Sequence, residues 1–209
     1  MLSALKSEGY AVRYKVLSTN EHGAPQHRPR LYVVAIKRPV KDFHFPETLP
    51  HCLDAHALID FKDKGKENQR SKIAAKNISA ARTDFENRGG NWDMDLVFVD
   101  IDASAKRATY RKDMPPCITR SRGGSGGPWV NLVNRRTSMD ELLKFQGFNP
   151  AEIPWRHMGL TKTQVGQASG NAMSANVLER LLPIVLDAAG LLQHPVRDAW
   201  ADPGYNPLL

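Results

Sequence analysis

The sequence predicts an α/β fold, because apolar runs typical of strands and of helices both occur along its 209 residues. Residues 10–17 alternate as a strand does, and residues 31–36 and 96–101 form apolar runs of strand length. Residues 174–189 carry an apolar stripe at helical spacing. Hydrophobic residues make up 41% of the chain and charged residues 24%, which is ordinary for a globular domain.

The N-terminal part is predicted to be the end of a helix followed by two strands. Residues 2–8 form a short helix that stops at Gly9, and a polar loop of residues 18–29 joins the strands. The continuous apolar run at residues 31–36 predicts a buried central strand. Since a strand–loop–strand unit cannot close a core by itself, we expect the chain to begin in the middle of a fold. Residues 39–60 are predicted to be a connector.

Spacing and turn residues predict the remaining elements. Residues 66–86 are predicted to be a helix with these residues at helical spacing: Ile73, Ala74, Asn77, Ile78 and Ala81. Residues 123–128 predict a flexible glycine-rich loop, and residues 139–145 a short helix with Ser138 as its N-cap. Pro183 is expected to kink the C-terminal helix or to mark a boundary in it.

Basic residues are concentrated in two clusters. The formal net charge is +7, from 29 Lys or Arg and 22 Asp or Glu. Residues 61–90 hold eight basic against four acidic side chains, and residues 106–122 hold six against one. Two such clusters that flank a strand-like run are typical of a footprint for nucleic acid.

The cysteine content and hydropathy indicate the compartment. Cys52 and Cys117 are too few for a disulfide framework and lack metal-site spacing, so we expect reduced thiols and no metal site. No stretch approaches the roughly 20 apolar residues of a membrane span. The N-terminus is too polar for a signal peptide. We therefore expect an intracellular protein with no membrane partner.

Three short blocks carry the chemistry. The first holds Gln26, Arg28 and Arg30, and this spacing puts three long polar side chains on one face of an extended backbone. Paired guanidinium groups there can grip a phosphate or a base carbonyl, although a solvated basic loop has the same pattern. The second block, residues 134–148, contains that short helix, and its simplest interpretation is a capped amphipathic helix that ends at Gly147. In the third block, residues 166–177, small residues precede a predicted helix. Small side chains allow the backbone to approach a ligand closely, and the first N–H groups of the helix are free to bind it.

In this order and spacing, the blocks resemble the last three conserved blocks of the DNA cytosine-5 methyltransferases. The matching positions are Gln26, Arg28 and Arg30; Arg135, Glu141, Lys144, Gln146, Gly147 and Phe148; and Gly170, Asn171, Ala172 and Met173. Residues 117–122 look like the segment that closes the recognition region in this family. Lys144 departs from the family, in which Arg is usual, and lacks the planar fork. The resemblance gives Glu141 and Gln146 a bracing role.

The resemblance implies the C-terminal part of a Rossmann-like, S-adenosylmethionine-dependent methyltransferase with a small irregular target-recognition lobe. Residues 1–40 would hold the last strands of the catalytic domain, and residues 41–122 the target-recognition region. Residues 123–192 would end that lobe and add the C-terminal helix. Residues 193–209 lie outside the resemblance, and their four Pro or Gly residues predict an extended tail. Such a protein would act on duplex DNA, in the nucleus of a eukaryote or the cytoplasm of a bacterium.

The resemblance also implies site residues. Arg28 and Arg30 would be the catalytic pair that holds a flipped cytosine and its neighbouring phosphate. Gly170, Asn171 and Ala172 would line the methionine end of the S-adenosyl-L-methionine pocket. Further DNA contacts would come from Gln26, Thr119, Arg120 and Arg122.

The nucleophile of the family is absent from this sequence. The cofactor loop, the Pro-Cys motif and the Glu-Asn-Val motif precede the first block in the family, and none of them stands before Gln26 here; the Pro-Cys pair at residues 116–117 follows that block. Neither Cys52 nor Cys117 sits in a nucleophile motif, and neither is expected to face a ring held by Arg30. Bases would be read from loops of the recognition region, with residues 123–127 able to approach the DNA closely.

Three interpretations of function follow. The first is a DNA cytosine-5 methyltransferase present as a C-terminal fragment or split subunit, inactive alone and completed by a separate N-terminal half. The second is a non-catalytic DNA-binding module derived from the same family. The third is an unrelated basic α/β protein whose blocks match by accident.

Overall fold

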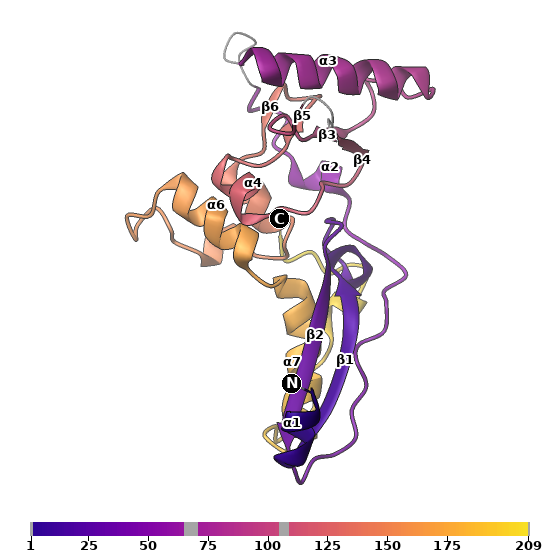
Figure 1. Cartoon of the computed structure of the whole chain (residues 1–209), viewed down its shortest axis with the longest axis vertical. Coiled ribbons are helices and arrows are strands. Elements are labelled where there is room, and N and C mark those ends of the chain that lie inside the picture. Colours follow the sequence, from indigo (N-terminus) through magenta and orange to yellow (C-terminus); the bar gives the residue numbers. More distant parts are fainter. Residues whose placement is uncertain (1, 65–70, 105–108, 209) are drawn as a thin grey trace.

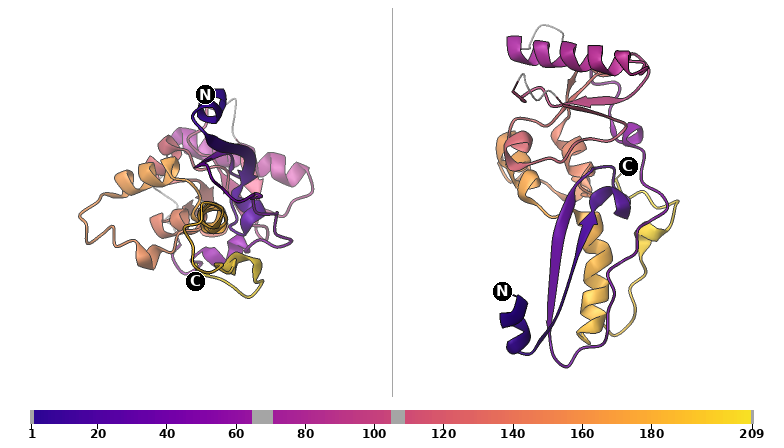
Figure 2. Two further views of the ribbon diagram at one scale, coloured as in Figure 1. Left: turned by 90° about the horizontal axis from the view of Figure 1, so that it is seen from below. Right: turned by 45° about the vertical axis from the view of Figure 1, so that its right-hand side comes forward.

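The computed structural model describes residues 2–64, 71–104 and 109–208, and the molecule is elongated (Figure 1). At one end a two-stranded hairpin lies against a long helix, and at the other a small sheet lies beneath a second long helix (Figures 1 and 2). Helices thus pack against both sheets, in agreement with the predicted α/β class. None of the described helices is long and apolar enough to cross a membrane.

The hairpin end of the molecule is built from the N-terminal elements and the last long helix. These are α1 (Leu2–Ser7), β1 (Tyr10–Ser18), η1 (Thr19–His22), β2 (Pro29–Lys37) and α7 (Ala175–Ala188). The two strands pair antiparallel, with Tyr10 opposite Lys37 and Ser18 opposite Pro29. α7 continues through Pro183, so this proline marks no helix boundary. One face of the hairpin packs on α7 through a cluster that includes Leu17, Tyr32, Ile36, Val177 and Leu181.

The predicted burial of residues 31–36 is wrong for the described chain. Leu31 is 62% exposed and Val33 is 37% exposed, whereas Tyr32 and Ile36 are buried. Side chains alternate between the two faces of a strand, and α7 covers only one face of the hairpin.

The far end of the molecule contains a four-stranded antiparallel sheet in the order β4-β3-β5-β6. Its elements are α3 (Lys72–Asn87), β3 (Val97–Val99), β4 (Tyr110–Lys112), β5 (Trp129–Val130) and β6 (Arg135–Arg136). The helix predicted at residues 66–86 is confirmed from Lys72, and residues 65–70 lie outside the described residues. The buried face of α3 consists of Ala74, Asn77, Ile78, Ala81 and Phe85. Ile73 is 63% exposed and does not belong to that face.

Short helices and the C-terminal tail form the middle of the molecule. The elements here are α2 (Ala55–Leu58), α4 (Arg120–Gly124), α5 (Met139–Lys144), η2 (Pro150–Glu152), α6 (Lys162–Asn171) and η3 (Ala199–Ala201). The predicted extended tail is wrong, because Trp200 and Leu208 are buried in the central core. The indole N–H of Trp200 donates to Glu179 Oε2 at 2.5 Å, which fixes the tail against α7.

α4 and α6 cross with their backbones in contact. A Cβ atom added to Gly123 would lie 1.9 Å from the carbonyl oxygen of Gly166, and one added to Gly166 would lie 2.0 Å from that of Gly123. The flexible loop predicted at residues 123–128 is therefore wrong for its first two positions, which are helical. Glycine occurs here because two helices can approach this closely only where neither carries a side chain.

Candidate functional site

Arg28 lies where three distant parts of the chain meet. Its guanidinium donates to the carbonyl oxygen of Ile118 and to those of Gly170 and Ala172, the last two at 3.1 and 2.7 Å. Arg28 is only 3% exposed, and none of the carboxylates in the described ranges forms an ion pair with it. Burial lowers the pKa of the Arg28 guanidinium from its ordinary value. Arg28 thus ties the first block of the sequence to the segment before α4 and to the end of α6.

Arg30, two residues further on, is exposed at the edge of this junction. Its Nη1 donates to the carbonyl oxygen of Pro29 at 2.8 Å, and its Nη2 lies 3.2 Å from Cys117 Sγ. The same sulfur lies 3.6 Å from Arg28 Nη1. Cys117 thus lies beside Arg30, because Arg28 holds the segment that contains it. We call Arg28, Arg30 and Cys117 the arginine niche.

The four residues predicted to contact DNA lie in different environments. Gln26 is fully buried, and its side-chain amide has no hydrogen-bond partner within the described ranges. Thr119 is the N-cap of α4, where its side chain accepts from the backbone N–H of Arg122. Arg122 Nε also donates to Asp100 Oδ2 at 2.9 Å. Arg120, on the first turn of α4, is exposed beside the niche.

The residues predicted to line a cofactor pocket lie at the end of α6 rather than at the start of a helix. Gly170 is buried, and a Cβ atom there would lie 2.4 Å from the backbone of Thr119 and Arg120. The carbonyl oxygens of Gly170 and Ala172 are occupied by Arg28. Asn171 is exposed, so its amide can reach a ligand. An amide that both donates and accepts suits the ammonium and carboxylate groups of an amino-acid moiety.

Glu141 and Gln146 brace the scaffold, as predicted. Glu141 forms a two-pronged ion pair with Arg135 at 2.8 and 2.9 Å, and its side chain is only 4% exposed. The hydrogen bonds that Arg135 donates to Glu141 raise the pKa of Arg135. Gln146 Nε2 donates to the carbonyl oxygen of Ser169 at 2.5 Å and lies 2.6 Å from its hydroxyl. These contacts hold α5 and α6 in place behind the niche.

Sequence reasoning missed a buried polar network between η1 and α7. Asn176 Nδ2 donates to the carbonyl oxygens of Thr19 and His22 at 2.9 and 2.8 Å. Arg180 contacts the ring of His22 and donates to Asp198 Oδ2 at 2.8 Å. Burial and the adjacent Arg180 lower the pKa of His22 to about 4. The sequence signal for this network is the pair Asn176 and Arg180. These two polar residues lie four positions apart beside the apolar stripe, so they share one side of the helix.

Comparison with known proteins gives the family. Residues 1–184 match the model of the C-5 cytosine-specific DNA methylases. The type II methyltransferase M.Bsp6I of Bacillus sp. is 38% identical over 186 residues, which cover 85% of this chain and 56% of that protein. The type II methyltransferase M.NgoBI of Neisseria gonorrhoeae is 29% identical over 189 residues, which cover 86% of this chain and 52% of that protein. The chain thus spans about half the length of the curated relatives that it matches.

Solved structures share the fold. The methyltransferase EhMeth of Entamoeba histolytica superposes with a TM-score of 0.57 at 19% identity, over 89% of this chain and 56% of that one. The Dnmt2 methyltransferase of S. pombe superposes with a TM-score of 0.52 at 13% identity, over 89% of this chain and 60% of that one. The fold is therefore that of the Rossmann-like methyltransferases. With the family model matched over residues 1–184, the chain belongs to the C-5 cytosine-specific DNA methylase family.

Proposed function

We propose that this chain is the DNA-holding half of a cytosine-5 methyltransferase, which replaces the hydrogen on C5 of a flipped cytosine with a methyl group. The observation that carries the proposal is the arginine niche, in which Arg28 joins the first block to the segment before α4 and to the third block, while Arg30 stays exposed. The nucleophilic thiolate and most of the cofactor pocket would come from the other half of the methylase domain.

Arg28 and Arg30 would divide the catalytic work. The η nitrogens of Arg28 already donate to backbone carbonyls, so Arg28 would fix the shape of the site. Arg30 has an exposed guanidinium and no described carboxylate partner, so it would donate to the carbonyl of the flipped base. A cation at that carbonyl stabilises the negative charge that develops when a nucleophile adds to the ring.

Backbone phosphates would be held at the start of α4. Arg120 is exposed there, and Thr119 presents its hydroxyl beside it. Arg122 would join them only after it leaves Asp100, and Gln26 would support the loop from within. Phosphate contacts of this kind set affinity and register but carry no sequence information.

S-adenosyl-L-methionine would supply the electrophilic methyl group. Asn171 would hold its amino-acid end, because its exposed amide offers both donors and an acceptor. Gly170 and Ala172 would contribute through shape, since their carbonyl oxygens are taken by Arg28.

The proposal predicts salt-dependent binding to duplex DNA. If the chain contacts about five phosphates, the logarithm of the association constant should fall with the logarithm of salt concentration at a slope near −4 to −5. Arg120→Ala should make that slope shallower by about 1, since one phosphate contact is lost. Arg38→Ala, an exposed arginine at the far end of the hairpin, is the matched control and should leave the slope unchanged. A flat salt response of the unmodified chain would contradict the proposal.

A further inference from the structure

The face of the hairpin opposite α7 is apolar and exposed. Tyr14 is 61% exposed, Val16 58%, Leu31 62% and Val33 37%. Tyr14 pairs with Val33 and Val16 with Leu31, so these four side chains form one contiguous patch across both strands. We call these four residues the hairpin patch. An apolar patch on a sheet face is typical of a surface that another layer covers.

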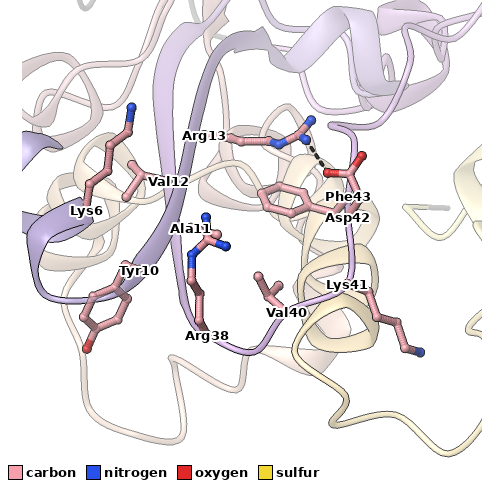
Figure 3. Close-up of a pocket in the computed structure, with 10 residues that line it drawn as sticks. All are labelled: Lys6, Tyr10, Ala11, Val12, Arg13, Arg38, Val40, Lys41, Asp42 and Phe43. Carbon is pink, nitrogen blue, oxygen red and sulfur yellow. Dashed lines mark hydrogen bonds and ion pairs between the residues drawn. The ribbon is translucent and has the colours of Figure 1, made fainter.

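One edge of the same hairpin is open. β1 runs beside the connector, where Arg13 is paired with Asp42 and stacks over Phe43. A cavity of about 500 Å³ lies between β1 and the connector, and Figure 3 shows the residues that line it. Among the described strands, β2 pairs with β1 alone, over its full length from Pro29 to Lys37. A nine-residue edge next to an exposed apolar face is a template for pairing with another strand.

We propose that the hairpin patch and the outer edge of β2 form the docking surface for the other half of the methylase domain. This inference rests on the proposed function, which requires that half for the nucleophile. Two observations select the occupant. The chain spans only 56% of M.Bsp6I and 52% of M.NgoBI, so a further segment of similar size exists in those relatives. A layered α/β domain also needs both faces of its sheet covered, and α7 covers one.

The test is co-expression with a defined partner. The part of M.Bsp6I that lies outside its match to this chain would be expressed from the same transcript as the tagged 209-residue chain. We expect a complex with one copy of each, measured by affinity capture followed by light scattering. Tyr14→Asp combined with Val16→Asp should reduce the recovered partner at least about tenfold, because a buried charge without a partner opposes docking.

The control is Met94→Asp, an equally exposed apolar residue at the far end of the molecule. Met94 is 73% exposed and lies outside the hairpin patch, so this variant should recover the partner as the unmodified chain does. Both variants change exposed side chains, and circular dichroism would verify that each remains folded. DNA binding by the chain alone should be the same in the Tyr14→Asp, Val16→Asp variant as in the unmodified chain, which separates this test from that of the proposed function.

Three results would overturn the docking proposal. The first is no complex with a folded, unmodified chain. The second is a complex that the Tyr14→Asp, Val16→Asp variant retains. The third is a dimer of this chain alone that the same two substitutions dissociate, since a second copy would then be the occupant of the hairpin patch.

Discussion

Arg28 and Arg30 are two residues apart and of one chemical type, yet the structure gives them opposite environments. Arg28 is buried and donates to carbonyl oxygens of Ile118, Gly170 and Ala172, whereas Arg30 is exposed. Arg28 lies in the loop just before β2, whereas Arg30 lies within β2, which begins at Pro29. At the scale of single residues, one arginine of the pair therefore supports the other.

Substitution of the two arginines should separate their roles. Arg28→Ala should lower the free energy of unfolding by about 2–4 kcal/mol, because it removes several charge-assisted hydrogen bonds from a buried site. Arg30→Ala should change that free energy by no more than about 0.5 kcal/mol, as is usual at an exposed position. In the enzyme reassembled with its other half, Arg30→Ala should reduce methyl transfer roughly 10- to 100-fold, more than it reduces DNA binding. Urea titration and a tritiated-methyl assay measure the two effects, and methyl transfer within about twofold of the unmodified enzyme would exclude the role of Arg30.

At the scale of elements, two contacts position the niche. The first is the crossing of α4 and α6, which brings Thr119 and Gly170 together. The second is the docking of η1 on the start of α7 by Asn176, Arg180 and the paired hydroxyls of Thr19 and Ser174. Both contacts join segments more than 40 residues apart in the sequence, so each depends on the whole chain being folded.

The crossing of α4 and α6 should be intolerant of a single methyl group. Gly166→Ala places a Cβ atom 2.0 Å from the carbonyl oxygen of Gly123, so the helices must separate. We expect a loss of about 1–3 kcal/mol, typical of overpacking. Gly204→Ala is the matched control, since its nearest neighbour would be Asp202 Oδ1 at 3.4 Å. Equal melting temperatures for the two variants would show that the crossing tolerates a side chain.

The contact between η1 and α7 should make stability depend on pH. The pKa of His22 is lowered from 6.5 to about 4 in the folded chain, so the unfolded chain binds the proton more tightly. The contribution of His22 is therefore complete above pH 6.5 and is lost as the pH falls toward 4. Between about pH 7 and pH 5 this loss amounts to at most about 2 kcal/mol.

Urea unfolding at both pH values would measure the effect of His22. His22→Gln removes the titrating group, so this variant should lose less stability than the unmodified chain over the same interval. If the free energy of unfolding depended on pH identically in the unmodified chain and in His22→Gln, the loss of stability in acid would come from carboxylates instead of His22.

At the scale of the whole molecule, the proposed function assigns this chain half of a site. The arginine niche lies where the start of β2 meets the segment before α4 and the end of α6, and the hairpin patch is exposed on the described surface. Cys117 is the thiol beside Arg30, but it lies in the segment that precedes α4, where the proposal places DNA backbone contacts.

The chain alone should therefore transfer no methyl group from S-adenosyl-L-methionine to DNA. The reaction requires a thiolate that adds to the cytosine ring, and the other half of the domain would provide it. Co-expression with that half should restore transfer of tritiated methyl groups to cytosine-containing duplex DNA. Cys117→Ala is the informative variant: it should leave the restored activity intact. Activity of the chain alone that disappears in Cys117→Ala would instead make Cys117 the nucleophile.

The sequence by itself determined the elements and the family. Apolar periodicity located β1, β2, α3 and α7, because burial of one face imposes a repeat of 2 or 3.6 residues on any chain. The order of the three blocks identified a methylase, and the N-cap at Ser138 could be predicted because a cap is local; the structure adds the capping box with Glu141. The resemblance to the family, rather than local periodicity, gave Glu141 and Gln146 their bracing role.

Only the tertiary structure decided what each site residue can touch. No local pattern distinguishes a buried Arg28 from an exposed Arg30, or places Cys117 beside them, because these contacts join residues about 90 to 140 positions apart. Glycines 123 and 166 look like loop residues in sequence, and only the helix crossing explains them. The burial of residues 31–36 was misjudged because it depends on what covers the second face of the hairpin. Long-range contacts carry no periodic signal, so burial and hydrogen bonding across them follow from the folded chain alone.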